Sequence, residues 1–100
     1  MELSDSQKKH LKGLAHDLNP VVMIGQHGLK PSIMEAIDQA LEHHQLIKIR
    51  ISADNRDLRD EWLAKILEHV SEASVIQKIG HIVVLYQRNP KKPDMTRHSS

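Results

Sequence analysis

The sequence contains no cysteine, and this absence removes several classes of function at once. Disulfide frameworks, zinc sites with thiolate ligands and cysteine nucleophiles all need a cysteine sulfur. No apolar run approaches the roughly 20 residues needed to cross a bilayer, and the N-terminal segment lacks the apolar core of a signal peptide. We therefore expect a cytoplasmic protein with no membrane partner.

Aromatic residues are almost absent, since Trp62 and Tyr86 are the only two. A sheet that stacks bases on several aromatic side chains, as an RRM does, is therefore excluded. Trp62 falls on the apolar stripe of a predicted helix and is expected in the core. Tyr86 is expected on an edge strand with its hydroxyl in water. Discrimination between individual bases should accordingly be poor.

Length and charge distribution predict one small domain followed by a basic tail. A chain of 100 residues supplies one core, and 39% hydrophobic residues is ordinary for a globular protein. The net charge is only +1, but residues 78–100 carry five Lys or Arg residues and a single Asp. We expect a domain at 1–88 and a flexible basic tail at 89–100, because the tail has one large apolar residue. A merely solubilising end segment is the alternative.

Hydrophobic periodicity predicts the element order α-β-α-β-α-β-β. Ser4 and Gln7 have the spacing of a capping box, Pro20 follows the end of the first helix, and Asp54 or Asn55 can cap the third. The predicted helices cover about 4–18, 31–44 and 55–70, and the strands cover 21–25, 46–52 and two runs within 74–88. Right-handed crossovers make the first two strands parallel, and a hairpin at Gly80-His81 completes the sheet. This predicts a single α+β domain with helices packed on a mixed four-stranded sheet.

Two of the four glycines lie three residues apart in VVMIGQHGLKPS, where a strand pattern gives way to a helix pattern. Successive backbone N–H groups at the positive end of a helix favour an anion, and Gly25 and Gly28 would let a phosphate approach the main chain. Lys30 adds a positive charge. The nucleotide-binding patterns GxxxxGK[ST] and GxGxxG are both absent, whereas GXXG loops bind nucleic-acid backbones in KH modules. A tight β-α turn is the structural alternative.

Two further cations lie on the second predicted strand, LIKIRIS. Its isoleucines alternate with Lys48 and Arg50, so one face is covered and the other carries positive charge. These cations either extend the phosphate contacts of the glycine loop or are ordinary solvated residues, and His27 is likewise a ligand contact or an exposed turn residue. The predicted RNA-binding residues are Gly25, Gln26, His27, Gly28, Lys30, Lys48 and Arg50.

Metal and catalytic sites are not expected. His43 and His44 are adjacent on a helix and point apart, and no HExxH pattern occurs among the eight histidines. The acidic run DNRDLRDE lacks the spacing of a calcium loop and is better explained as a helix cap and a solvated face. No nucleophile, base and orienting group can be assembled, so we expect no enzyme and no cofactor. A small hydrolase acting on phosphorylated substrates is the enzymatic alternative.

Several separated motifs resemble the CRM domain (chloroplast RNA splicing and ribosome maturation), and specifically the small stand-alone bacterial YhbY family. The resemblance covers about residues 3–88. The matching motifs are Leu14-Ala15-His16, Pro20-Val21, Ile24-Gly25, Gly28-Leu29, Ile47-Lys48-Ile49, Ile79-Gly80 and Val84-Leu85-Tyr86.

This resemblance implies the fold of the C-terminal domain of bacterial translation initiation factor three. It also implies RNA binding through the GxxG loop and association with ribosomal RNA or precursors of the large ribosomal subunit. Many CRM domains have a lysine after the first glycine, whereas this chain has Gln26. We expect a monomer that assists ribosome assembly; a protein-protein interaction module, in which GxxG is only a turn, is the alternative.

Overall fold

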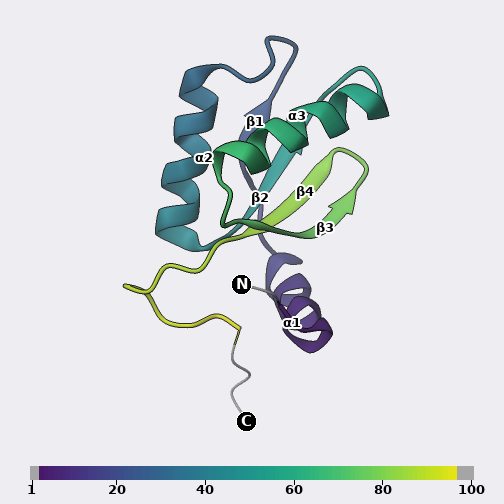
Figure 1. Ribbon diagram of the computed structural model, residues 1–100. Coiled ribbons are helices and arrows are strands. Elements are labelled where there is room, and N and C mark those ends of the chain that lie inside the picture. The colour runs from purple at the N-terminus through teal and green to yellow at the C-terminus, as the bar shows by residue number, and fades with distance from the viewer. Residues whose placement is uncertain (1–2, 97–100) are drawn as a thin grey trace.

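The computed structural model describes residues 3–96, and its elements follow the predicted order (Figure 1). The helices are α1 (Asp5–Ala15), α2 (Pro31–His44) and α3 (Arg56–His69), and the strands are β1 (Pro20–Ile24), β2 (Leu46–Ile51), β3 (Ser74–Ile79) and β4 (Ile82–Tyr86). The single α+β domain with a mixed four-stranded sheet is thus confirmed. No helix within residues 3–96 has the length and apolar character to span a bilayer.

The helix ends follow the capping signals of the sequence. Ser4 and Gln7 form the predicted capping box, with the Gln7 N–H 3.1 Å from the Ser4 Oγ and the Ser4 N–H 2.9 Å from the Gln7 Oε1. Asn55, rather than Asp54, caps α3 by accepting the Leu58 N–H over 2.8 Å. The first helix ends at Ala15, about a turn earlier than expected.

The sheet has the strand order β1-β2-β4-β3. β1 and β2 are parallel, and the other two pairs are antiparallel, as predicted. β3 returns along the outer side of β4, so β4 is an interior strand. The edge position expected for Tyr86 is therefore wrong, since its side chain is only 4% exposed and its hydroxyl has no hydrogen-bond partner in the part of the chain described. Burial of this phenol raises its pKa.

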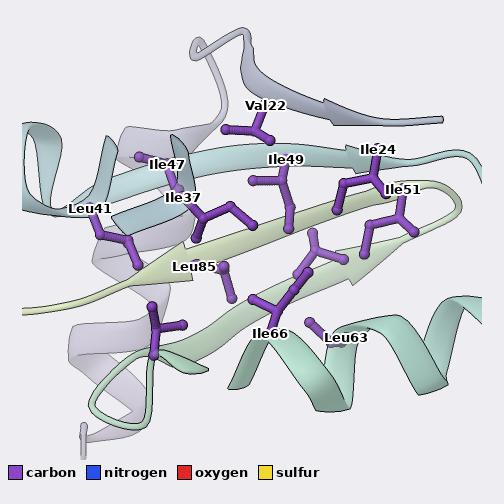
Figure 2. Packing of buried hydrophobic residues seen from close by; sticks show 12 residues of the cluster. Val22, Ile24, Ile37, Leu41, Ile47, Ile49, Ile51, Leu63, Ile66 and Leu85 are labelled. Carbon is purple, nitrogen blue, oxygen red and sulfur yellow. The ribbon is translucent and has the colours of Figure 1, made fainter. Parts of the chain in front are cut away.

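One face of the sheet packs against α2 and α3 and forms the main core (Figure 2). Ile47, Ile49 and Ile51 project from β2 into this layer and are at most 1% exposed. Ile37 and Leu41 of α2 contact them, and α3 contributes further apolar side chains. Full burial of one such side chain contributes roughly 1.5 to 3 kcal/mol, so this layer dominates the stability of the domain.

The opposite face of the sheet is covered only in part. Leu11 and Ala15 of α1 pack on Leu46 and Tyr86, at the end of the sheet remote from the β1–α2 loop (Figure 1). The rest of this face lies beyond the reach of the 11-residue helix. The sheet therefore presents an uncovered surface on the side where Lys48 and Arg50 project.

Residues 89–96 of the predicted basic tail lie against the domain. The Gln45 Oε1 accepts the Arg88 guanidinium and the Asn89 N–H, each over 2.9 Å, and the Gln45 Nε2 donates to the Pro93 carbonyl over 2.9 Å. Met95 packs against the α1 cluster. These hydrogen bonds stand in for the apolar surface that the segment lacks, while residues 97–100 lie outside the described part.

We expect Gln45→Ala to lower the free energy of unfolding by about 2 to 4 kcal/mol, because it removes three hydrogen bonds and leaves partly buried polar groups of the C-terminal segment unpaired. Gln45 is only 3% exposed, whereas Gln39 is exposed on α2, so Gln39→Ala is the matched control. Urea denaturation followed by circular dichroism measures both. Equal stabilities would mean that residues 89–96 do not dock in solution.

Candidate nucleic-acid interface

The GxxG loop (residues 25–28) is a tight turn between β1 and α2. The Gly28 N–H donates to the Gly25 carbonyl over 3.0 Å and closes the turn. The Gly28 N–H is therefore not available to an anion, although the sequence had predicted that it would be. The N–H groups of Gln26 and His27 have no protein acceptor among residues 3–96, and both residues are exposed. The turn therefore presents two free main-chain donors to solvent.

The two glycines have different structural roles. Gly28 adopts a φ of 72°, which disfavours any side chain, and a Cβ there would lie 3.4 Å from the indole of Trp62. Gly25 has an ordinary φ, and nothing lies within 4 Å of the position of its missing Cβ. The conformation of the turn thus accounts for Gly28, whereas Gly25 leaves open space beside the free donors.

The start of α2 contributes less to an anion site than the sequence suggested. Lys30 is its N-cap residue and makes no side-chain capping bond, and Pro31 has no N–H to donate. The N–H groups of Ile33 and Met34 both donate to the Lys30 carbonyl. Positive charge at this helix end therefore comes mainly from the exposed Lys30 side chain, one residue beyond Leu29 and the loop.

Lys48 and Arg50 both project from β2 on the side that α1 partly covers, but they differ in their contacts. The Lys48 Nζ donates to the His16 carbonyl over 3.2 Å at the C-terminal end of α1. The Arg50 side chain is exposed and has no ion pair or hydrogen bond within residues 3–96. Its register partner on β1 is Met23, two residues before Gly25, so Arg50 lies at the loop end of the sheet.

The structure therefore groups most of the predicted site residues at one end of the sheet. The loop residues, Lys30 and Arg50 lie at this end, while Lys48 lies one step toward α1. The contact between Trp62 and Gly28 was not predictable from the sequence, because it joins two residues far apart in the chain. The apolar stripe of α3 placed Trp62 in the core, and the structure shows it partly buried against the core and beneath the loop.

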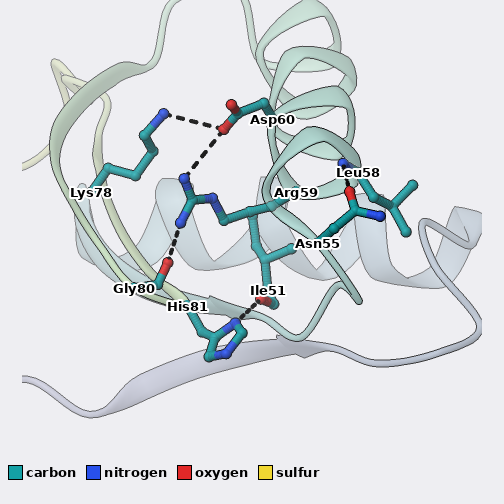
Figure 3. A network of polar contacts seen from close by, with 8 residues as sticks. All are labelled: Ile51, Asn55, Leu58, Arg59, Asp60, Lys78, Gly80 and His81. Atoms are coloured by element: carbon teal, nitrogen blue, oxygen red, sulfur yellow. Dashed lines mark hydrogen bonds and ion pairs between the residues drawn. The ribbon is translucent and has the colours of Figure 1, made fainter.

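A polar network stabilises the adjoining corner between α3 and the β3–β4 hairpin (Figure 3). Asp60 accepts from the Lys78 Nζ over 3.2 Å, and the Arg59 guanidinium donates to the Gly80 carbonyl. The His81 Nδ1 lies 3.1 Å from the Ile51 carbonyl, at the end of β2. The hydrogen bond from Lys78, together with the charges of Lys78 and Arg59, lowers the pKa of Asp60. Its contribution to stability is present above the ordinary carboxyl pKa and declines at more acidic pH.

Within residues 3–96, no three His, Asp or Glu side chains lie close enough together to hold a metal ion. His43 and His44 have ring centroids 6.2 Å apart on the surface of α2. The polar groups beside the GxxG loop are hydrogen-bond donors and cations. Such groups suit a phosphate-bearing ligand rather than a cation.

Comparison with known proteins identifies the family. Residues 3–87 match the CRS1 / YhbY (CRM) domain, and the chain belongs to this family. A protein of Haemophilus influenzae that is named an RNA-binding protein is 45% identical over 85 residues, which is 85% of each chain. A protein of Pseudomonas aeruginosa, named a probable RNA-binding protein, is 33% identical over 91 residues, covering 91% of this chain and 86% of its own.

A solved structure has the same fold. The solution structure of a hypothetical protein of Staphylococcus aureus, described as a candidate RNA-binding protein, superimposes with a TM-score of 0.71 at 32% identity. The match covers 88% of this chain and 91% of the other. The elements that position the GxxG loop thus belong to a shared architecture.

We expect Gly28→Ala to destabilise the fold by about 1 to 2 kcal/mol, because alanine is disfavoured at a left-handed φ. Gly25→Ala should stay within about 0.5 kcal/mol of the parent protein, since its backbone and surroundings accept a Cβ. Urea denaturation measures both, and the emission of Trp62, the only tryptophan, reports on the loop. An equal loss at the two glycines would contradict the turn described above.

Proposed function

We propose that this protein binds RNA through the sugar-phosphate backbone, and that the GxxG loop is the main contact. The observation that carries the proposal is the exposed turn with two free N–H groups beside a glycine that leaves open space. Lys30 and Arg50 flank this turn with positive charge. Relatives named RNA-binding proteins, with 33% to 45% identity, support RNA as the ligand.

The binding mode follows from the groups available. Main-chain N–H groups and flexible cations contact phosphates, which position an RNA but carry no sequence information. With Lys48 as a further cation, about three to five phosphates come into contact, and the slope of log K against log salt should be about −2 to −4. RNA shape, more than base identity, then determines affinity.

The biological role that we propose is assistance in the assembly of the large ribosomal subunit, with ribosomal RNA in its precursors as the partner. Support for this role comes from the match of residues 3–87 to the CRS1 / YhbY (CRM) domain, together with the resemblance that implied such a partner. The protein would act as a binding factor without catalysis. The rival function is a protein-interaction module. It is favoured by Gly28, because the left-handed φ of the turn explains this glycine without any ligand.

Gln26 offers the sharpest test of the loop, because it is exposed and its N–H is free. Gln26→Lys should tighten binding to a ribosomal RNA fragment about fivefold at low salt, and Gln26→Glu should weaken it to a similar degree. The lysine variant should also steepen the salt slope by about 0.7 to 0.9, which corresponds to one added phosphate contact. Filter binding at several salt concentrations measures both quantities.

The control for these variants is Gln39→Lys and Gln39→Glu, which change the same charge on the exposed surface of α2. If the Gln39 pair shifts affinity as much as the Gln26 pair, binding depends on net charge and the loop has no special role. If neither pair matters and the parent protein binds RNA with no salt dependence, phosphate contact is the wrong mechanism.

The proposed role in assembly predicts that tagged protein co-sediments with precursors of the large subunit in a sucrose gradient, and that Gln26→Glu reduces this fraction. Crosslinking followed by sequencing of the attached RNA then locates the contact. Sedimentation only with free protein fractions, or only with the small subunit, would refute the role while leaving RNA binding to be judged from the filter assay.

A further inference from the structure

The uncovered half of the sheet presents one continuous row of side chains across all four strands. Met23 pairs with Arg50, Arg50 pairs with Ile82, and Ile82 pairs with Ile79. A second row, nearer α1, runs from Lys48 through Val84 to Gln77. We call the two rows together, without the buried Val84, the open sheet face: Met23, Lys48, Arg50, Gln77, Ile79 and Ile82.

Large apolar side chains are unusually exposed on this face. Met23 is 65% and Ile79 60% exposed, and they are the two most exposed large apolar residues among residues 3–96. They stand at opposite ends of the first row, with Ile82 and Arg50 between them. A hollow of about 250 Å³ lies at the Ile79 end of this face, lined by Lys48, Gln77, Ile79 and Ile82 together with His16 and Val84. Ile82 and Ile79 are neighbours around this hollow, and adjoining exposed apolar groups are typical of a surface that contacts a partner.

The charge of this face favours a polyanion as that partner. The four strands contain no Asp or Glu, and their basic residues are Lys48, Arg50 and Lys78. Lys78 points to the other side of the sheet and bonds to Asp60. Lys48 and Arg50 therefore lie among apolar side chains with no carboxylate on their own strands, which is the pattern expected opposite phosphates.

The open sheet face is also continuous with the GxxG loop. Met23 precedes Gly25 by two residues, and Arg50 lies beside Met23 in the register. A strand that contacts the loop donors can therefore continue over the first row. Adjacent strands lie about 4.8 Å apart, so the row spans roughly 14 Å, the length of about four nucleotides at a rise of about 3.4 Å each, or of fewer when the bases are splayed apart.

We propose that the open sheet face binds unpaired nucleotides of the RNA, with Met23, Ile79 and Ile82 against base faces and with Lys48 and Arg50 at phosphates. This inference rests on the proposed RNA binding and adds a preference for unpaired over fully paired RNA. In an A-form duplex the base faces are stacked inside, so apolar side chains have nothing to contact except sugars. Apolar contact with a base face carries little sequence preference, in agreement with the scarcity of aromatic and amide groups here.

The test uses a double variant, Met23→Thr with Ile79→Thr, which removes the exposed apolar groups and keeps strand propensity and charge. We expect it to weaken binding to a single-stranded RNA about fivefold, from the lost apolar contact area. Binding to a fully paired duplex of the same length should stay unchanged. The salt slope for both RNAs should also stay unchanged, because no cation is removed.

The comparison variant is Leu14→Gln with Leu18→Gln, which removes apolar groups that are 42% and 38% exposed on and just after α1, around a separate hollow that Lys48 also borders. It should leave both affinities unchanged. Thermal melting checks that each variant retains the stability of the parent protein. We expect no loss of stability, because all four substituted side chains are exposed. If the control weakens single-strand binding as much as the test variant, the assignment to the open sheet face is overturned.

The outcomes separate this inference from the proposed function. If Gln26→Glu weakens RNA binding while the threonine variant binds both RNAs like the parent protein, the loop functions and the open sheet face does not. If the threonine variant loses co-sedimentation with ribosomal particles but keeps its affinity for naked single strands, the face contacts a protein and the inference fails. If the parent protein binds neither RNA, the proposed function fails with it.

Discussion

The alternation of side chains along β2 is the constraint on which the rest of the structure depends. Ile47, Ile49 and Ile51 are buried beneath α2 and α3, and this burial fixes the register of β2 with both neighbouring strands. A slip of one residue would exchange the two faces and bury Lys48 and Arg50 in the core, at a cost of several kcal/mol for each unpaired charge. The register that stabilises the core therefore also places the two cations on the uncovered face.

The same register positions the GxxG loop. Because Ile24 pairs with Ile51, the chain leaves β1 at the end of the sheet where β2 also ends, and Trp62 supports the turn from below. The loop is thus held by the core at Gly28 and free at Gln26 and His27. A rigid base with exposed donors requires little ordering of the loop when a ligand binds, which favours affinity.

Much of this fold was predictable because its signals are local. The capping box at Ser4, the alternation in β2 and the glycine turn at Gly80 each act within a few residues, and the elements appeared in the predicted order, although α1 ended about a turn early. The docking of residues 89–96 was not predictable, because its cause is the buried amide of Gln45, more than 40 residues away in the chain. The predicted edge position of Tyr86 was wrong for a related reason. The local pattern does not show whether β3 or β4 pairs with β2, and this choice decides which of the two is the edge strand.

The candidate site was only partly readable from the sequence. The GxxG motif and the alternation of residues in β2 located the loop and its neighbouring cations, because both are patterns of the sequence itself. It gave no means to separate the roles of Gly25 and Gly28, since that difference rests on a backbone angle and on the contact with Trp62. The exposure of Met23 and Ile79 was equally hidden, because it depends on how far α1 reaches across the sheet.

A chain of net charge +1 can present a basic surface because its charges are divided between layers. The acidic residues of α2 and α3 lie on helices that cover the isoleucine face, whereas Lys48 and Arg50 project from the other side of the sheet. At physiological ionic strength the Debye length is about 8 Å, less than the thickness of a sheet with its helical layer. Repulsion between those carboxylates and a phosphate on the far face is therefore largely screened. The local pattern of charge along the strands, rather than the net charge, then governs which partner this side of the protein attracts.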